Sequence, residues 1–570
     1  MNGTSHNKTI GDISLLSLFT LFFTIIIVQT LHFVNVGVNF LILPAAIIIS
    51  VLLWIKLTNY TDNKKIISII ALFLLLFVGL TLIAGNFLSN DYDGNSYHKM
   101  AVGFLKNGWN PLYESANTFS PRYFSNETVT SMDIWIDHYG KASWFFASAV
   151  YAFTDNIECG KVYNLLSIIT LFGILYNYLS EKFPSKKYTN IIISVLTAAN
   201  PITIPQILQY YVDGFMCSML FILIIGLTIL IDNEINNNKI KAWSIIFPAM
   251  IVLGNIKFTG LAYGGIFCII YFIYSIIKNR KTESKTVIFK RFATFSFTAV
   301  VTTVWAGAST YIQNIIEHGN ALYPLAGPDK VDIITDNAPM GFAGKSSIFK
   351  LFYSLFSQSQ NLNRREECPL PTLKFPFSIY PEEYNECYRG DLRIGGFGVF
   401  FGGLIIIALI ILITWLIISI IKKNFKSPQI YITVNMLTII ALSLIISDSW
   451  WARYSPYIYL LVIFAIVPLL YYTEQKWLKI CSAIVILLLL KNNSIFAEPL
   501  NNAMKASYQE KMAFQSLSGT TIDVINEIDF PGIFFNLEDN DITYNIIFDE
   551  NMEGEEAIYY NYMKYNKISE

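Results

Sequence analysis

The chain has 570 residues, of which 54% are hydrophobic and only 14% are charged, and its mean hydropathy is +0.47. A soluble globular protein carries about 25% charged residues, so the composition excludes that class and predicts a protein built for lipid. Forty basic and 41 acidic residues give a net charge of -1, and this balance argues against a nucleic-acid partner. The six cysteines include no Cys-x-x-Cys pair, so neither a metal knuckle nor a thioredoxin-like site is indicated.

Apolar runs near the roughly 20 residues that a helix needs to cross a bilayer recur along the chain. The first run is too long for a signal peptide and lacks a small-residue cleavage site, so we expect an uncleaved first span. The sequence thus predicts an all-α polytopic membrane protein with about 13 transmembrane helices. The expected spans cover 13–33, 37–56, 66–88, 160–180, 188–205, 207–231, 242–255, 259–278, 290–312, 396–421, 429–447, 454–472 and 476–491.

Short loops rich in Lys and Arg predict the orientation, because basic residues near span ends stay in the cytoplasm. With thirteen spans, all of these loops fall on the same side, which places the N-terminus in the cytoplasm and the tail after Lys491 outside. The abundance of Asn, Ile, Lys and Tyr favours a bacterial source, and hence the bacterial cytoplasmic (inner) membrane. The basic residues are Lys56, Lys64, Lys65, Lys182, Lys186, Lys187, Lys278, Arg280, Lys281, Lys285, Lys290, Arg291, Lys422, Lys423 and Lys426.

Four predicted outer segments are too polar to be plain connectors: 90–139, 200–214, 313–398 and 448–454. A shorter outer segment, 255–259, contains Lys257. Charges at span ends are costly unless they serve a cavity or a function. Each polar residue of these segments, taken alone, is explained by solvation in water or lipid headgroups. Their concentration on one face of the membrane indicates a functional site.

The first outer segment has the most specific pattern. Asp91-Tyr-Asp93 is followed by Tyr97-His98 and then by a predicted helix to Lys106, which Gly108 and Pro111 end. Met100, Phe104 and Leu105 are spaced to share one face, which predicts an amphipathic helix at the membrane surface. An acid just before such a helix lies where a lipid phosphate donor and an aqueous acceptor can meet.

This order of apolar span, outer Asp, Tyr four residues later, surface helix and Gly-x-x-Pro resembles the first outer loop of the GT-C superfamily of membrane glycosyltransferases. That superfamily includes protein O-mannosyltransferases and the lipid A aminoarabinose transferase. The resemblance implies that Asp93 is the catalytic carboxylate, with Asp91 as a possible substitute, and that Tyr97 and His98 bind substrate. It also implies a GT-C-like membrane domain over 1–491 with outer loops 89–158 and 313–395.

The segment His138-Tyr-Gly-Lys141 is similar to the second GT-C motif, although the Pro-Pro that usually follows the Lys is absent. Further segments look like patterns in bacterial members and add Asp213, His318 and Tyr323 to the substrate-binding candidates, together with His138. Five scattered histidines show no ligand spacing, so no metal site is predicted. The pair Asp91 and Asp93 leaves a divalent metal open.

Cations suit the phosphate of a leaving lipid, and the candidates are Lys141, Arg453, Arg393 and Lys257. Two of them have a structural alternative. Arg453 could anchor a span end beside Trp450 and Trp451, as interfacial aromatic belts do, and Lys257 could cap helix carbonyls.

The resemblance implies transfer of a sugar from a polyprenyl phosphate to a cell-envelope glycan, lipid or protein acceptor. A single carboxylate that takes the acceptor proton would invert the anomeric centre. Two alternatives stay open. A transporter or flippase for lipid-linked glycans would be expected to show repeats or broken helices, and no clear repeat is visible. A polymerase or ligase would depend on Arg and His in a late outer loop.

The tail, 492–570, is expected to form a small extracytoplasmic α/β appendage that helps to dock the acceptor. Asn501–Leu517 is predicted as a helix, and Gly532–Leu537 and Thr543–Ile547 as short strands. Cys368 and Cys387 share the third outer segment, in an oxidising compartment, which predicts a disulfide.

Overall fold

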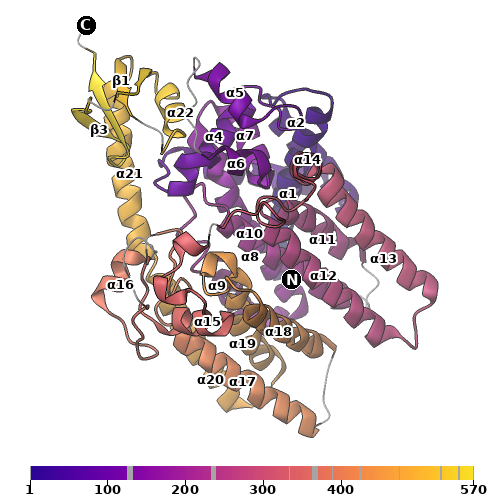
Figure 1. Cartoon of the computed structure of the whole chain (residues 1–570). Helices are drawn as coiled ribbons and strands as arrows, with labels where there is room; N and C mark the ends of the chain where they lie inside the picture. The colour runs from indigo at the N-terminus through magenta and orange to yellow at the C-terminus, as the bar shows by residue number, and fades with distance from the viewer. Residues whose placement is uncertain are drawn as a thin grey trace.

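The computed structural model describes residues 2–124, 132–232, 239–332, 334–362, 370–387, 389–422, 427–473, 475–526, 529–549 and 552–568. Within these residues the chain is mostly helical, with one small sheet near the C-terminus (Figure 1). Cys368 lies outside them, so the predicted disulfide stays a prediction; Cys387 is buried.

Eight helical stretches among the described residues are long and apolar enough to cross a membrane. This confirms a mostly α-helical, multi-pass membrane protein. Eight of the thirteen predicted runs correspond to these stretches. The stretches are Lys8–Phe33, Asn63–Gly85, Ile157–Lys182, Asp213–Asp232, Phe258–Asn279, Lys285–Trp305, Phe401–Ile418 and Lys476–Leu517.

The other five predicted runs also contain helices, of 12 to 19 residues. The run expected at 188–205 is helical only over α9 (Lys187–Ala198), and turns follow as far as Tyr210. Pro201 and Pro205 explain this end, because proline has no backbone N–H for a helical hydrogen bond. Eight of the thirteen expected spans are therefore supported by length and composition, and the count of thirteen stays a prediction.

The first group of helices surrounds α10, which is buried along almost its whole length. α10 packs against α8, α11 and α12, and α1 packs against α2, α8 and α11. The group consists of α1 (Asn2–Phe33), α2 (Ile42–Thr58), α3 (Asn63–Gly85), α8 (Val162–Lys182), α9, α10 (Asp213–Asp232), α11 (Lys239–Gly254), α12 (Phe258–Asn279) and α13 (Lys285–Val300).

The second group lies beside the first and is centred on α19, which contacts the other three members. It joins the first group through contacts of α18 with α10 and of α19 and α20 with α9. The members are α17 (Phe401–Lys422), α18 (Ser427–Ile445), α19 (Tyr459–Tyr472) and α20 (Lys476–Ser494).

Capping residues explain where several of these helices begin and end. Asn59 ends α2 in the left-handed conformation (φ 51°), and the Asp62 carboxylate starts α3 by accepting from the backbone N–H of Lys64 and Lys65. Asn is tolerated at left-handed C-terminal positions, and Asp is a preferred N-cap. A tight basic turn thus joins two apolar helices.

Short helices fill the predicted outer segments. α4 was expected to lie on the membrane surface, and this expectation is wrong: Lys99 to Leu105 are all buried, because α5, α7 and the C-terminal α22 pack around it. α4 does end at Lys106, as predicted, and Gly108 takes a positive φ of 98°. The short helices are α4 (Lys99–Lys106), α5 (Ala116–Tyr123), α6 (Asp133–His138), α7 (Ala142–Thr154), α14 (Gln313–His318), α15 (Ser347–Phe356) and α16 (Pro381–Glu386).

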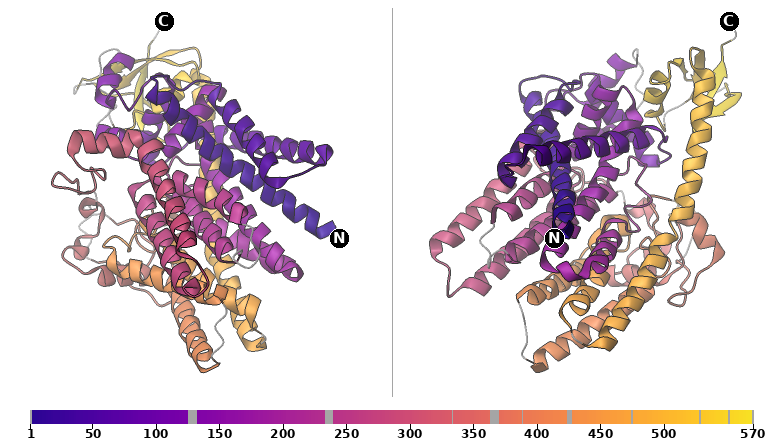
Figure 2. Two further views of the ribbon diagram at one scale, coloured as in Figure 1. Left: turned by 90° about the vertical axis from the view of Figure 1, so that its right-hand side faces the viewer. Right: turned by 180° about the vertical axis from the view of Figure 1, so that it is seen from behind.

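The tail starts with α21 (Ala497–Leu517), close to the predicted helix, and continues the direction of α20 (Figure 2, right). A four-stranded sheet of order β2-β1-β4-β3 follows, in which β1 and β2 are parallel and the other pairs antiparallel. The strands are β1 (Thr521–Ile525), β2 (Thr543–Ile547), β3 (Glu556–Ile558) and β4 (Met563–Lys567). The predicted strand at 543–547 is confirmed, but the one at 532–537 is wrong, since α22 (Ile533–Glu538) lies there.

The tail is anchored in the first outer segment. Phe535 of α22 packs on Phe104 of α4, at 6.4 Å between ring centroids. The buried Lys99 ammonium donates to Asn536 of α22 at 2.9 Å and to Glu158 at 2.6 Å, and Tyr559 also contacts this ammonium. The Gly532 N–H donates to the Asn95 carbonyl at 2.8 Å. The tail and the first segment are therefore on the same side of the molecule.

Figure 1 shows the sheet at the upper left, whereas the basic turn between α12 and α13 lies at the lower right. In the view turned by 90°, the N-terminus also lies far from the sheet (Figure 2, left). This separation agrees with the sidedness expected from the Lys-rich loops.

Candidate functional site

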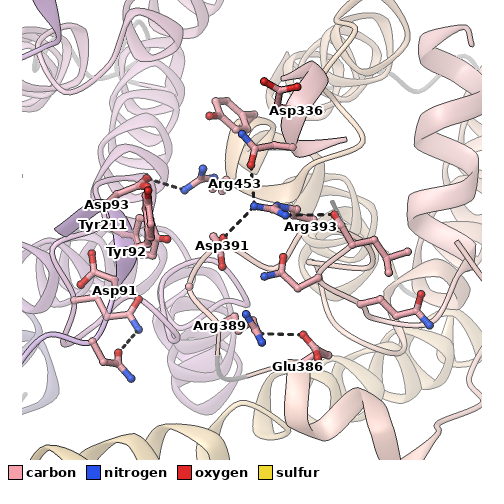
Figure 3. A pocket seen from close by; sticks show the side chains of 18 of the residues that line it. Asp91, Tyr92, Asp93, Tyr211, Asp336, Glu386, Arg389, Asp391, Arg393 and Arg453 are labelled. Carbon is pink, nitrogen blue, oxygen red and sulfur yellow. Dashed lines mark hydrogen bonds and ion pairs between the residues drawn. The ribbon is translucent and has the colours of Figure 1, made fainter. Parts of the chain in front are cut away.

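All of the predicted outer segments and the tail line one pocket, of about 980 Å³. Figure 3 shows it between the first segment, with Asp91 and Asp93, and the third, with Asp391 and Arg393. The described lining residues are Asn90–Asp93, Tyr97, Met132, Trp135, Tyr139, Gln209, Tyr211, Lys257, Val331, Asp332, Asp336, Asn337, Gln358–Leu362, Glu382, Glu383, Glu386, Arg389–Asp391, Arg393, Arg453, Tyr454, Phe530 and Tyr562.

Four charged side chains form a network at one wall of the pocket. Arg453 donates to the Asp93 carboxylate at 3.1 Å and lies 3.8 Å from Asp213. Asp213 also forms an ion pair with Lys257. Asp93, Arg453 and Lys257 face the pocket, whereas the Asp213 side chain is buried beneath the two cations. The network therefore holds two positive charges next to a carboxylate that is accessible from the pocket.

Asp93 is positioned by the backbone around Asp91. The buried Asp91 carboxylate accepts from the N–H of Gly94 at 2.8 Å and of Tyr210 at 3.1 Å, which fixes the turn η1 (Gly94–His98). A Cβ on Gly94 would approach the Asp91 Oδ2 to 2.3 Å, so no larger residue fits. Asp91 also lines the pocket, but it is only 3% exposed and its oxygens accept these hydrogen bonds, whereas the Asp93 side chain is 21% exposed.

Two guanidinium groups share the indole of Trp451. The Arg453 group lies 4.4 Å from the ring centroid and the Arg393 group 5.4 Å. Arg393 also donates to Asn337 at 2.8 Å and is 4.0 Å from Asp391 (Figure 3). Trp450 and Trp451 are each 1% exposed. Buried indoles cannot form an aromatic belt at the headgroups, so the alternative role for Arg453 is not supported.

Lys257 directs its ammonium to Asp213 and lies 4.9 Å from the Tyr454 ring centroid. Its side chain therefore belongs to the charged network, and no capping of a helix carbonyl by its ammonium is found within the described residues.

Burial raises the pKa of Asp93 above its ordinary value; the charges of Arg453 and Lys257 lower it, and the negative charges of Asp391 and Asp213 raise it. The net direction is upward. A carboxyl with a raised pKa is a better proton acceptor when it is ionised. The site can thus combine a base with cations for an anionic ligand.

Lys141 occupies a different environment. Its buried ammonium donates to the carbonyls of Asp137 at 2.7 Å and Tyr139 at 3.1 Å, and it is not among the described residues that line the pocket. His98 is also buried away from the lining; its Nδ1 accepts from the Trp144 indole at 2.7 Å. Tyr97 lines the pocket, as expected for a substrate-binding residue.

Three of the predicted substrate-binding residues meet outside the pocket. The His318 ring stacks on Tyr323 at 3.6 Å between centroids, and the His138 ring packs edge-on against both. Glu317 lies beside them, and the ligand atoms of His138, Glu317 and His318 are all within 4.8 Å of one another. This cluster was not predicted from the sequence, because 179 positions separate His138 from Glu317 and only ligands close in sequence show a recognisable spacing.

Some residues that line the pocket were also not predicted from the sequence. Tyr211 and Asp391 were in segments singled out as polar, but neither was assigned to the site. Phe530 and Tyr562 reach the pocket from the tail, with their rings stacked at 4.5 Å. No sequence signal places these tail aromatics near Tyr92, which meets Phe530 edge-on at 5.4 Å.

No family model matches the chain, and no curated protein matches it significantly in sequence.

Proposed function

We propose that the chain is a membrane glycosyltransferase of the GT-C type, which transfers a sugar from a polyprenyl-phosphate donor to an envelope acceptor on the outer face of a bacterial cytoplasmic membrane. The observation that carries the proposal is the pairing of the pocket-facing Asp93 with Arg453, at 3.1 Å, beside Lys257. A base and two cations at one wall of a large polar cavity are what sugar transfer from a lipid phosphate needs.

In the proposed reaction, the acceptor hydroxyl attacks the anomeric carbon while its proton passes to the Asp93 carboxylate. The bond between the anomeric carbon and the phosphate oxygen breaks, and both of its electrons leave with the lipid phosphate. Arg453 and Lys257 stabilise the charge of the leaving phosphate. Arg393 can assist them, because its guanidinium and that of Arg453 both lie over the indole of Trp451. Attack by one activated hydroxyl inverts the anomeric centre.

The ion pair between Asp93 and Arg453 suits this order of events. The positive charge of Arg453 lowers the pKa of Asp93 in the ligand-free site. A bound phosphate competes for the guanidinium and partly neutralises it, so donor binding makes Asp93 a stronger base.

The test is donor consumption in proteoliposomes, with radiolabelled polyprenyl-phosphate hexoses and pentoses and with membranes of the deletion strain as the source of acceptor. We expect one donor to lose its sugar to a glycan and Asp93→Asn to abolish most of this transfer. Asp155→Asn is the matched control, since Asp155 is an exposed acid on the same side that pairs with Lys106 at 2.9 Å. A protein that moved the lipid-linked sugar across the bilayer with its sugar–phosphate bond intact would be a transporter, and the proposal would fail.

The proposed orientation has its own test. Thr118 is exposed in the first outer segment, and Thr282 is exposed in the basic turn between α12 and α13. A cysteine at 118 should react with a membrane-impermeant thiol reagent in intact cells, and one at 282 only after lysis. The opposite pattern would place the pocket in the cytoplasm.

A further inference from the structure

We propose that His138, Glu317 and His318 form a Zn²⁺ site that joins α6 to α14 at the edge of the pocket. One ligand atom from each residue lies within 4.8 Å of the other two. His138 ends α6, and Glu317 and His318 end α14, so the three ligands come from two outer segments that are distant in sequence. This inference does not depend on the proposed sugar transfer.

Packing holds both imidazoles near each other without any other bond between them. The His318 ring is stacked on Tyr323 with 11° between the planes, and the His138 centroid is 4.7 Å from that of His318. Ligands that are already immobilised lose little conformational entropy when a metal binds.

Asn314 fixes the orientation of His138. Its amide nitrogen donates to the carbonyls of His138 and Tyr323, at 3.2 and 2.8 Å, so its Oδ1 faces the His138 Nδ1 at 2.8 Å. The Nδ1 therefore carries the proton and donates it to Asn314, and the same Nδ1 lies 3.9 Å from a Glu317 carboxylate oxygen. The lone pair is on Nε2, so the Glu317 carboxylate must move from Nδ1 toward Nε2 when a metal binds. A metal-binding histidine commonly donates its other N–H to such an acceptor, which fixes the ring and raises the basicity of the ligand.

The donor set selects the metal. Two imidazoles and one carboxylate suit Zn²⁺, whereas Ca²⁺ and Mg²⁺ need sets of oxygen ligands. Zinc–ligand bonds of about 2.0–2.2 Å bring tetrahedral ligand atoms to roughly 3.4 Å from one another, so the cluster must contract modestly. The Glu317 side chain is 48% exposed and can move inward. The fourth position is left for water.

The site would brace one wall of the pocket. Trp135 of α6 and the neighbouring Met132 and Tyr139 line the pocket. The Tyr139 carbonyl accepts from Thr310 at 2.9 Å, just before α14. Zinc would add a third connection, beside Asn314 and Thr310, between this wall and the chain around α14.

The experiment measures metal content and thermal stability of the full chain in detergent, purified without a histidine tag and treated with a chelator. Added Zn²⁺ should restore about one metal per chain and raise the Tm, and Mg²⁺ should do neither. His318→Phe keeps the ring stack on Tyr323 but removes the ligand nitrogen, and Glu317→Gln removes the charged ligand. Because loss of an outer-shell partner alone weakens metal binding 10- to 100-fold, each variant should bind Zn²⁺ at least about tenfold more weakly.

Glu181→Gln is the matched control, since its side chain is 53% exposed and lies far along the chain, on α8. It should bind Zn²⁺ like the parent. The proposal is overturned if the parent takes up no stoichiometric zinc, or if both site variants keep its Zn²⁺ affinity and its zinc-dependent rise in Tm. A failure of sugar transfer would leave these readouts unaffected.

Discussion

The two aspartates that contact Arg453 should respond in opposite ways to the same substitution. Asp93 faces the pocket with a side chain that is 21% exposed, and Asp213 is buried at 1%. In Asp93→Asn, the amide oxygen can still accept from Arg453, which also keeps its contact with Asp213. Because the amide keeps this hydrogen bond and Arg453 keeps Asp213, no buried group is left without a partner, so we expect a loss of stability of about 1 kcal/mol.

Asp213→Asn removes the partner of Lys257, the side chain of which is only 6% exposed. Breaking a buried ion pair from one side leaves an uncompensated charge and costs about 3–5 kcal/mol. Asp213→Asn should therefore be much the less stable variant. The transfer rate should distinguish the two variants in the other direction. Loss of a general base lowers the rate about 10²- to 10⁴-fold, and Asp93→Asn should show this loss while its fold stays intact.

The assay combines initial rates of transfer in proteoliposomes with thermal unfolding in detergent, on protein that elutes as a single species. Asp93→Asn should lie near the parent in Tm and far below it in rate. If it transferred sugar at the parent rate, Asp93 would not be the base. If the two variants were equally stable, the assignment of Asp213 as the structural centre of the network would be refuted.

Three further predictions follow from the same geometry. The transfer rate should fall as the pH falls through the raised pKa of Asp93, and Asp391→Asn should move this acid limb to lower pH, because the Asp391 charge raises that pKa; an unmoved limb would show that another group controls it. Lys141→Met should lower stability by about 1–3 kcal/mol, because the Asp137 carbonyl loses the Lys141 donor and the Tyr139 carbonyl keeps only Thr310, and leave the donor KM unchanged; a raised KM at parental Tm would return Lys141 to the donor site. Gly103→Ala should loosen the tail, measured as faster proteolysis, at a cost of about 1–3 kcal/mol, since its Cβ would come within 2.2 Å of the Phe535 ring. Gly79→Ala is the control, because no atom lies within 4 Å of its Cβ, and slower or equal cleavage of the Gly103 variant would contradict the packing.

The helices could be predicted because apolar runs are a local property of the chain. Each of the thirteen runs contains a helix, and Pro201 and Pro205 explain why the helix in the run 188–205 ends at Ala198. Asp93 and Arg453 were both assigned to the site, although 360 positions separate them, because sidedness can be derived from basic loops even when contacts cannot.

The errors concern residues whose surroundings come from distant parts of the chain. α4 has the pattern of a surface helix, but α22 covers the face that would otherwise meet solvent. Ile533–Leu537 is rich in residues typical of strands, yet it is buried on all sides as a helix, where packing overrides propensity. The histidine cluster and the tail aromatics depend on contacts of the same long-range kind.

The anchoring of the tail also has a consequence for how the protein is made. Synthesis proceeds from the N-terminus, yet the Leu88 N–H donates to Ser507, 419 positions later, and Lys99 finds Asn536 and Tyr559 437 and 460 positions later. The buried Lys99 of the first outer segment therefore lacks these partners until Asn536 and Tyr559 have been synthesised. A prematurely terminated chain would present this unfinished surface to proteases and chaperones. The pocket, to which Phe530 and Tyr562 contribute, is therefore completed only after these tail residues have been synthesised.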